Sequence, residues 1–208
     1  VNMFEAEDKL FSFNYQSIYE PPEKRLEQHK TLISDHYLRQ FNEEIINPKR
    51  FTHCGEPCAI ACKKYLLKYK KDYEPYQALG PNIGIFDQRA AEKVNYAVDA
   101  EGLDAIHTGG TISWLMECFH RGILNPVDFG FEDFAPAFSF IFNANNFDIV
   151  KDSAHNAEIA LGILQMILYT PQGKPFRKGF RYASAWLDRK YKVKTRDLAV
   201  YNAHGKCG

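Results

Sequence analysis

Asp87-Gln-Arg-Ala-Ala-Glu-Lys-Val-Asn-Tyr-Ala-Val-Asp-Ala-Glu-Gly-Leu-Asp-Ala-Ile-His-Thr-Gly-Gly-Thr111 is the stretch that indicates a helical fold. Asp87 is a typical N-cap for a helix over about 88–100, and Gly102 is placed to end that helix. A second helix is predicted over about 110–121, ending at Arg121-Gly122. Its apolar side carries Ile112, Leu115, Met116 and Phe119. The segment between Gly102 and this helix is therefore expected to be a turn between two helices.

Apolar residues at intervals of three and four predict further helices on both sides of this pair. Their expected ranges are about 23–45, 154–169 and 175–190. Strict alternation of apolar and polar residues is weak throughout, with one faint case near 136–142. The expected fold class is therefore all-α (mostly α), in one multihelical domain.

Two segments lack helical periodicity. Residues 1–22 are irregular and end at the breaker Pro21-Pro22. Residues 124–153 are rich in Pro, Phe, Asn and Asp and are predicted to form a long loop with short turns. Neither segment marks a compelling domain boundary, so we treat residues 1–208 as a single helical domain.

Composition limits the classes of function. The 208 residues carry 26 Lys plus Arg and 26 Asp plus Glu, so the balance of charge gives no argument for nucleic acid or for an anionic membrane. Apolar residues make up 45%, which is enough for a core without disulfides. No apolar run is long enough to span a membrane, and no secretory signal begins the chain. We expect a cytoplasmic, reducing location.

Cysteines are clustered in the run Thr52-His-Cys-Gly-Glu-Pro-Cys-Ala-Ile-Ala-Cys-Lys-Lys64. Thiolates this close together favour a metal centre, because soft sulfur ligands must converge on one small centre. A helix is predicted from Ala59 to Lys68, with Cys58 and Cys62 on one face and Cys54 reaching back from the preceding turn. Zinc, with His53 as a further ligand, and inert buried thiols remain alternatives.

A cuboidal 4Fe-4S cluster needs a fourth ligand, and no fourth cysteine lies near the trio. Cys118 and Cys207 are distant in sequence. Either one of them folds back, or the ligand belongs to a part of the protein outside this sequence. Cys118 lies in an apolar helical face, so a core thiol is the expected role for it.

The second motif is Asp99-Ala-Glu-Gly-Leu-Asp104, which is followed by Gly109-Gly110-Thr111. Carboxylates in a turn between helices can accept hydrogen bonds from a heterocycle, and a helix N-terminus can receive an anion. Plain helix capping, in which Gly102 ends one helix and Thr108 or Thr111 caps the next, explains the same residues and is favoured when the motif is taken alone.

The third motif is Tyr73-Glu-Pro-Tyr76, in a predicted loop over 72–87. A carboxylate in an aromatic, proline-bounded loop can serve as a general acid or base. An exposed loop residue is the simpler interpretation of Glu74 alone.

Taken together in their order and spacing, these motifs resemble the aldehyde:ferredoxin oxidoreductases, the tungsten–pterin enzymes of archaea and anaerobic bacteria. The resemblance also includes Gly80-Pro81-Asn82, Gly110-Thr111 and Glu117, and covers residues 45–125 best. Cys54-Gly-Glu-Pro-Cys58, Tyr73-Glu-Pro-Tyr76 and Val98-Asp-Ala100 are most similar to the glyceraldehyde-3-phosphate branch of that family.

The resemblance implies a fold, cofactors and roles for residues. This chain would be the middle helical domain of a larger enzyme that holds a tungsten bis-pterin and a 4Fe-4S cluster. Cys54, Cys58 and Cys62 would be three cluster ligands, with the fourth outside this chain. Glu74 would manage protons beside tungsten. The implied pterin-binding residues are Asp99, Gly102, Leu103, Asp104, Asn82 and Thr111. One departure is Ala59, which replaces the proline usual in the family after the second cluster cysteine.

The implied partners are the N-terminal β domain and the C-terminal helical domain of the same enzyme, and ferredoxin as the electron acceptor. A homo-oligomer of the full-length protein is a further expectation. Two rival functions stay open from the residues alone: a stand-alone iron–sulfur electron-transfer module, and a structural helical domain that is apo or holds zinc. We expect the isolated chain to be inactive, and Glu74 and Asp104 to face one concave, exposed surface lined also by Tyr73, Asn82 and Thr111.

Overall fold

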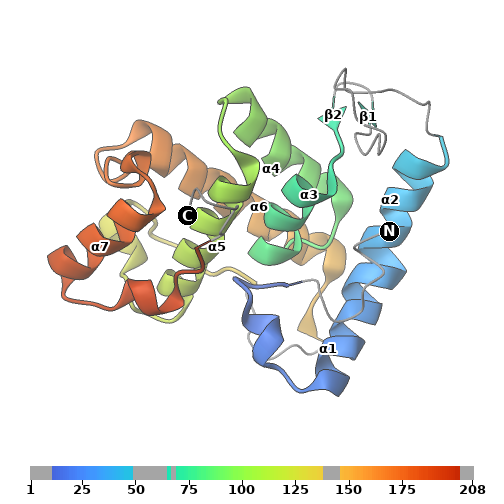
Figure 1. Ribbon diagram of the computed structural model, residues 1–208, viewed down its shortest axis with the longest axis horizontal. Helices are drawn as coiled ribbons and strands as arrows, with labels where there is room; N and C mark the ends of the chain where they lie inside the picture. Colours follow the sequence, from blue (N-terminus) through green and yellow to red (C-terminus); the bar gives the residue numbers. More distant parts are fainter. Residues whose placement is uncertain (1–10, 49–64, 67–68, 138–145, 202–208) are drawn as a thin grey trace.

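The structure is a computed structural model, and it describes residues 11–48, 65–66, 69–137 and 146–201. The described part is mostly helical, as the sequence predicts, with one pair of two-residue strands. None of its helices is both long and apolar enough to cross a membrane. Figure 1 shows the N-terminal helical run at one edge, α4, α5 and α6 in the middle, and α7 at the opposite edge.

The elements follow in this order: η2 Gln16–Tyr19, α1 Pro22–Gln28, η3 His29–Leu38, α2 Arg39–Phe41, η4 Asn42–Ile46, β1 Tyr65–Leu66, β2 Tyr69–Lys70, α3 Tyr73–Ala78, η5 Pro81–Ile83, α4 Gln88–Ala100, α5 Ala105–His120, η6 Pro126–Phe129, α6 Ile149–Tyr169, η8 Phe176–Lys178, α7 Phe180–Tyr191 and η9 Thr195–Leu198. The first helical run continues without a break from Pro22 to Ile46, with π-helical turns in η3 and η4. The helix predicted over 23–45 is therefore confirmed.

Helix α4 begins and ends where the sequence predicts. The Asp87 side chain accepts hydrogen bonds from the amides of Arg89 and Ala90 at 3.0 and 3.4 Å, so it caps the helix. Gly102 adopts a left-handed conformation with φ 68°, which a residue with a side chain adopts at a cost.

Helix α5 begins at Ala105, five residues earlier than predicted. Asp104 is its N-cap and accepts a hydrogen bond from the His107 amide at 2.6 Å. Gly109 and Gly110 therefore lie inside the helix and do not open it. Gly109 allows α3 to approach, because a Cβ atom there would lie 2.4 Å from the Ala78 carbonyl oxygen.

Helices α6 and α7 confirm the two predicted C-terminal helices with shifted starts. Asp148 caps α6 through the Lys151 amide at 3.0 Å, so the helix begins at Ile149 rather than near 154. The predicted loop over 124–153 is therefore shorter at its end. It contains η6, and its residues 138–145 lie outside the described part.

The loop predicted over 72–87 is wrong, because it contains the short helices α3 and η5. Pro75 lies in the first turn of α3, where a missing amide hydrogen costs no helical bond. The helix predicted from Ala59 to Lys68 is also wrong at its end, since Tyr65–Leu66 pairs antiparallel with Tyr69–Lys70. The rest of that prediction lies outside the described residues.

Helix α5 lies at the centre of the core, and every residue from Thr108 to Phe119 is buried. Trp114 is fully buried, and its indole nitrogen donates a hydrogen bond to the Thr195 carbonyl at 2.8 Å. The Trp114 ring also meets Phe180 with ring centroids 4.7 Å apart. The central helix thereby joins α7 and η9 to the rest of the fold.

Candidate cofactor site

The cysteine trio Cys54, Cys58 and Cys62 lies outside the described residues, so its convergence stays a prediction. Among the residues that the structure does describe, no group of three or more His, Cys, Asp or Glu is placed to hold a metal ion. Cys118 is fully buried in α5, and burial raises the pKa of its thiol well above the usual value. Cys118 is therefore a core thiol, as expected.

The Asp99–Asp104 motif joins two helix ends. The Leu103 amide donates to the Val98 carbonyl at 3.2 Å and the Gly102 amide donates to the Asp99 carbonyl at 3.0 Å. This pair of bonds around a left-handed glycine is the Schellman ending of a helix. Leu103 packs against the core, and Asp104 then caps the next helix. The capping interpretation is thus confirmed at Gly102, which ends α4, and is wrong for the next helix, because Asp104 caps α5 and Thr108 and Thr111 lie inside it.

The same turn is open on its outer side. Asp99, Gly102 and Asp104 are exposed, and a Cβ atom added to Gly102 would meet nothing within 4 Å. Within the described ranges, no hydrogen bond from another residue to the Asp99 carboxylate is recorded. A ligand with N–H donors can therefore approach this carboxylate along the uncovered side of Gly102.

Asn82 and Thr111 differ from the expected exposed lining, since only 1% and 5% of their surfaces are exposed. The Asn82 amide nitrogen donates to Ser113 Oγ at 3.1 Å, and Thr111 Oγ1 donates to the His107 carbonyl at 2.9 Å. Both side chains are bonded inside the fold. The predicted open surface lined by these two residues is therefore wrong for this chain.

Glu74 is half-buried in the first turn of α3, where its negative charge suits the helix N-terminus. Helix α3 contacts α5 where Ala78 meets Gly109. Ala78 follows Glu74 by four residues and Gly109 follows Asp104 by five, so the two predicted carboxylates lie on helices that touch. A single face shared by Glu74 and Asp104 stays a prediction.

Sequence reasoning missed a buried polar network around Glu117 of α5. Glu117 is fully buried, and its carboxylate accepts hydrogen bonds from Asn14 at 2.5 Å and from Arg121 Nε at 2.7 Å. Asn14 also bonds Ser113 Oγ at 3.1 Å and the Leu198 carbonyl at 3.0 Å. The spacing of four between Ser113, Glu117 and Arg121 is a polar stripe on an apolar helix and is the signal that could have revealed this network.

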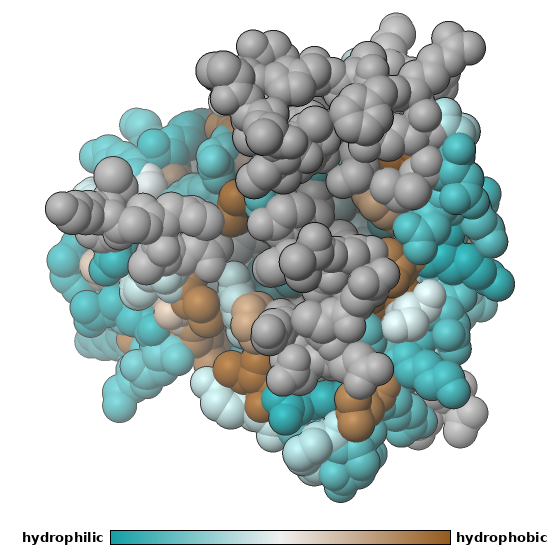
Figure 2. Space-filling model, turned by 45° about the vertical axis from the view of Figure 1, so that its right-hand side comes forward, coloured by the Kyte–Doolittle hydropathy of each residue, from teal (hydrophilic) through white to brown (hydrophobic). Residues whose placement is uncertain are grey.

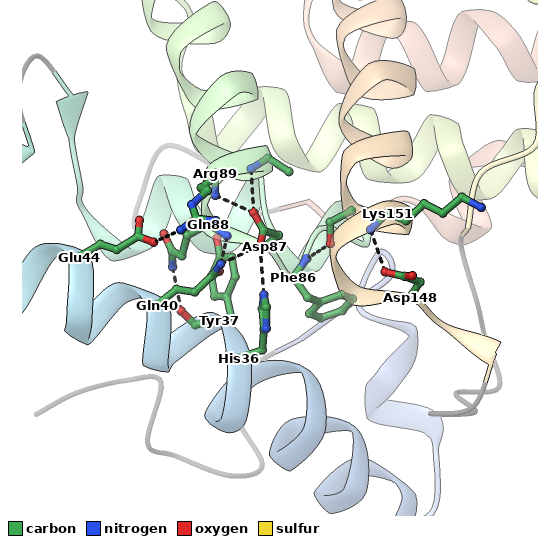
Figure 3. Close-up of polar contacts among 12 residues, drawn as sticks. His36, Tyr37, Gln40, Glu44, Phe86, Asp87, Gln88, Arg89, Asp148 and Lys151 are labelled. Carbon is green, nitrogen blue, oxygen red and sulfur yellow. Dashed lines mark hydrogen bonds and ion pairs between the residues drawn. The ribbon is translucent and has the colours of Figure 1, made fainter.

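A second network centres on Asp87 and holds the N-terminal helical run against α4 (Figure 3). Asp87 Oδ2 accepts from Gln40 Nε2 at 2.7 Å and contacts His36 Nε2 at 3.1 Å, while Oδ1 caps α4. The Arg89 guanidinium donates to Glu44 at 2.9 Å beside it. One carboxylate thus serves both as a helix cap and as an anchor between two elements.

The third missed group is Lys71, just before α3. Only 1% of Lys71 is exposed, and its ammonium pairs with Glu92 of α4. The same ammonium lies 4.5 Å from the centroid of the Tyr76 ring. Burial lowers the pKa of Lys71, and the bond to Glu92 opposes this shift. No periodic signal in the sequence distinguishes Lys71 from Lys63, Lys64, Lys68 and Lys70.

Comparisons with known proteins identify the family. Residues 1–205 match the family described as "Aldehyde ferredoxin oxidoreductase, domains 2 & 3". The chain therefore belongs to the aldehyde ferredoxin oxidoreductase family, as the motifs indicated.

Several curated relatives support the same family. The chain is 36% identical to the glyceraldehyde-3-phosphate:ferredoxin oxidoreductase of Pyrococcus furiosus over 94% of this chain and 30% of that protein. It is 34% identical to an uncharacterized protein of Methanocaldococcus jannaschii over 97% of this chain and 34% of that protein. A tungsten-containing aldehyde ferredoxin oxidoreductase of Pyrococcus abyssi is 28% identical over 73% of this chain and 24% of its own length. The chain thus spans about a third or less of each of these relatives.

Proposed function

We propose that this chain is a helical part, the middle domain, of a tungsten-pterin, 4Fe-4S aldehyde:ferredoxin oxidoreductase that oxidises aldehydes to carboxylic acids. The observation that carries the proposal is the turn from Asp99 to Asp104. Its carboxylates are exposed above a glycine with open space around it, at the motif on which the family resemblance depends. Membership of the family supplies the reaction class.

The turn suits a pterin by its donor set. Asp99 and Asp104 would accept hydrogen bonds from the N–H groups of the heterocycle, and Gly102 leaves room for its approach. Leu103 would hold the turn on the core. The resemblance also implies Asn82 and Thr111 as pterin-binding residues, but their polar atoms already bond within the fold. Cys54, Cys58 and Cys62 have the soft sulfur donors that an iron–sulfur cluster needs, with a fourth ligand outside this chain.

The overall reaction is RCHO + H2O → RCOOH + 2 H+ + 2 e−. When bound, a tungsten–pterin centre would supply the acceptor for the electron pair and an iron–sulfur cluster would supply one-electron transfer. Glu74 would be the general base that takes a proton from water or the aldehyde hydrate, and it would release this proton to solvent.

The partners follow from the same proposal. Ferredoxin would accept the electrons, and the remaining domains of the longer protein would complete the cofactor site. Hydrophobic side chains lie toward the middle of the face in Figure 2, with hydrophilic ones at both flanks. The large apolar residues that stay exposed include Tyr19 at 77% and Leu26 at 47%. Neighbouring domains would cover such residues. The proposed location is cytoplasmic, and the isolated chain would have no activity.

The experiment uses the full-length protein, purified without oxygen. We expect tungsten and iron by elemental analysis, a brown colour with absorbance near 400 nm, and aldehyde-dependent reduction of a viologen dye. In that protein Asp104→Ala should lower the pterin content, whereas Glu74→Gln should keep this content and reduce turnover about a hundredfold. Iron without tungsten would instead favour an electron-transfer module. Zinc alone, or no metal, would favour a structural domain.

A further inference from the structure

Helix α3, which carries Glu74, is too short to be stable by itself. It has only six residues. Isolated helices of this length are unstable in water, so contacts from outside must hold α3 in place. The source of these contacts decides where Glu74 lies.

The C-terminal half of α3 is held by the core. The Tyr37 hydroxyl donates to the Tyr76 carbonyl at 2.6 Å, and Ala78 packs against Gly109 of α5. Gln77 Nε2 donates to the Phe11 carbonyl at 2.7 Å. These contacts all involve residues that follow Glu74 in the chain.

Lys71 is the buried group at that entry, three residues before Glu74. Its ammonium forms an ion pair with Glu92 of α4 and lies under the Tyr76 ring of α3. Lysine is seldom fully buried, because removing an ammonium from water is costly unless it is paired. The ion pair with Glu92 and the contact with the Tyr76 ring can form together only when the chain enters α3 along one path. The Lys71 cation therefore fixes the start of α3 against α4.

We propose that Lys71 is a positioning residue for Glu74, because its cation fixes the entry of α3 on α4. The inference rests on the proposed function, since it concerns the proton-handling role given to Glu74 there. Lys71 itself takes no part in the chemistry. Its loss would let the first turn of α3 shift, and displacements of about 1 Å at a reacting group can reduce a rate by about a hundredfold.

The test compares three variants of the full-length protein. Lys71→Met removes the cation and keeps an unbranched side chain that is one atom shorter. Lys71→Arg keeps a cation that can pair with Glu92 and stack on Tyr76. Lys93→Met is the matched control on α4, because Lys93 forms an exposed pair with Glu158, with the side chains 55% and 64% exposed.

Two readouts are measured: aldehyde oxidation per bound tungsten, and amide hydrogen exchange over residues 73–79. For Lys71→Met we expect kcat to fall by about tenfold or more with little change in the KM for aldehyde, and exchange to quicken by about tenfold. Lys71→Arg should recover most of both effects, and Lys93→Met should match the wild type. A folded Lys71→Met protein with wild-type kcat and wild-type exchange would overturn the proposal.

The design separates this proposal from the proposed function. If the wild type oxidises no aldehyde, the proposed function fails, and the exchange measurement still decides whether Lys71 holds α3. If Lys71→Met does not fold, Glu92→Gln removes the partner charge from the less buried end of the pair. It should lower kcat and quicken exchange in the same direction, and unchanged values in that variant would overturn the proposal.

Discussion

Asp87 and Glu117 are both buried carboxylates that join segments distant in sequence, but their pKa values move in opposite directions. Burial alone would raise both. At Asp87 the hydrogen bonds from His36 and Gln40, together with the two capping amides of α4, outweigh burial and lower the pKa. At Glu117 burial outweighs the bonds from its partners and raises the pKa.

The difference arises from where each carboxylate lies. Asp87 sits at a helix N-terminus, where backbone amides and the helix dipole both favour negative charge. Glu117 lies inside α5, whose own amides are already bonded, so only side chains can reach it. Asn14, the closest of them, is held with φ 52° between two other left-handed residues. Equal burial therefore gives a stabilising anion at a helix start and a costly one in a helix interior.

The largest effect is expected for Glu117→Ala. The substitution leaves the amide of Asn14 and the guanidinium of Arg121 without their buried partner, so the free energy of unfolding should fall by about 3 kcal/mol. Urea unfolding of the chain measures this. Glu158→Ala, in the exposed pair with Lys93, is the control and should change stability by less than about 0.5 kcal/mol. Equal losses in both variants would remove the distinction between buried and exposed carboxylates.

Asp87→Ala should cost somewhat less, about 2 kcal/mol. The variant loses a helix cap, about 1 kcal/mol, and the bond from Gln40, about 1 kcal/mol. Asp104→Ala is the matched control, because Asp104 is an exposed N-cap with one recorded capping bond. It should cost about 1 kcal/mol by the same measurement. A larger loss at Asp104 than at Asp87 would contradict the anchoring role of Asp87.

The difference between these two caps also shows what the sequence could predict. The position of Asp87 before an amphipathic stretch is local information, and it predicted α4 correctly. The bonds from His36 and Gln40 join residues about fifty positions away, which no local pattern encodes. The start of α5 was missed because Gly109-Gly110 resembled a helix opening, whereas Gly109 serves a close contact with Ala78 that exists only in the folded chain.

The candidate site shows the same limit. The family motif gave the positions Asp99, Gly102 and Asp104, and the structure explains the glycine by its left-handed φ. Burial of Asn82 and Thr111 could not be predicted, since it depends on the packing of η5 against α5. Lys71 was missed because its burial depends on an ion pair with a glutamate distant in sequence. The residues beside a lysine do not show whether such a partner exists.

Opposite pKa shifts predict opposite pH dependences for two isosteric variants. The lowered pKa of Asp87 means that its contribution is present above the unfolded-state pKa, about 4, and is lost as pH falls through the folded pKa. The stability lost in Asp87→Asn should therefore shrink on acidification. The raised pKa of Glu117 means that the wild type loses stability as pH rises from about 4.5 through the folded pKa.

Glu117→Gln cannot ionise, so the stability lost in this variant should shrink as pH rises instead. Urea unfolding between pH 3 and pH 8 for the wild type and both variants measures the two slopes. The stability lost in Asp87→Asn should grow as pH rises, whereas the stability lost in Glu117→Gln should shrink. Both losses should be about 1 kcal/mol. Parallel slopes would show that burial does not dominate at Glu117.

The smallest effect is expected at Arg89, the exposed arginine beside Asp87, and Arg121 beside Glu117 is its counterpart. Arg89 is 74% exposed and pairs with Glu44 at the rim of the Asp87 network, so Arg89→Ala should change the free energy of unfolding by less than about 0.5 kcal/mol.

Arg121 contacts the fully buried Glu117, so Arg121→Ala should cost about 1–2 kcal/mol. It should also raise the pKa of Glu117 further, because the charge of Arg121 is one of the groups that lower it. The stability of Arg121→Ala should then fall more steeply with rising pH than that of the wild type, whereas the pH profile of Arg89→Ala should follow the wild type. If Arg89→Ala costs as much as Arg121→Ala, the ranking by burial is wrong and both arginines act as general surface charges.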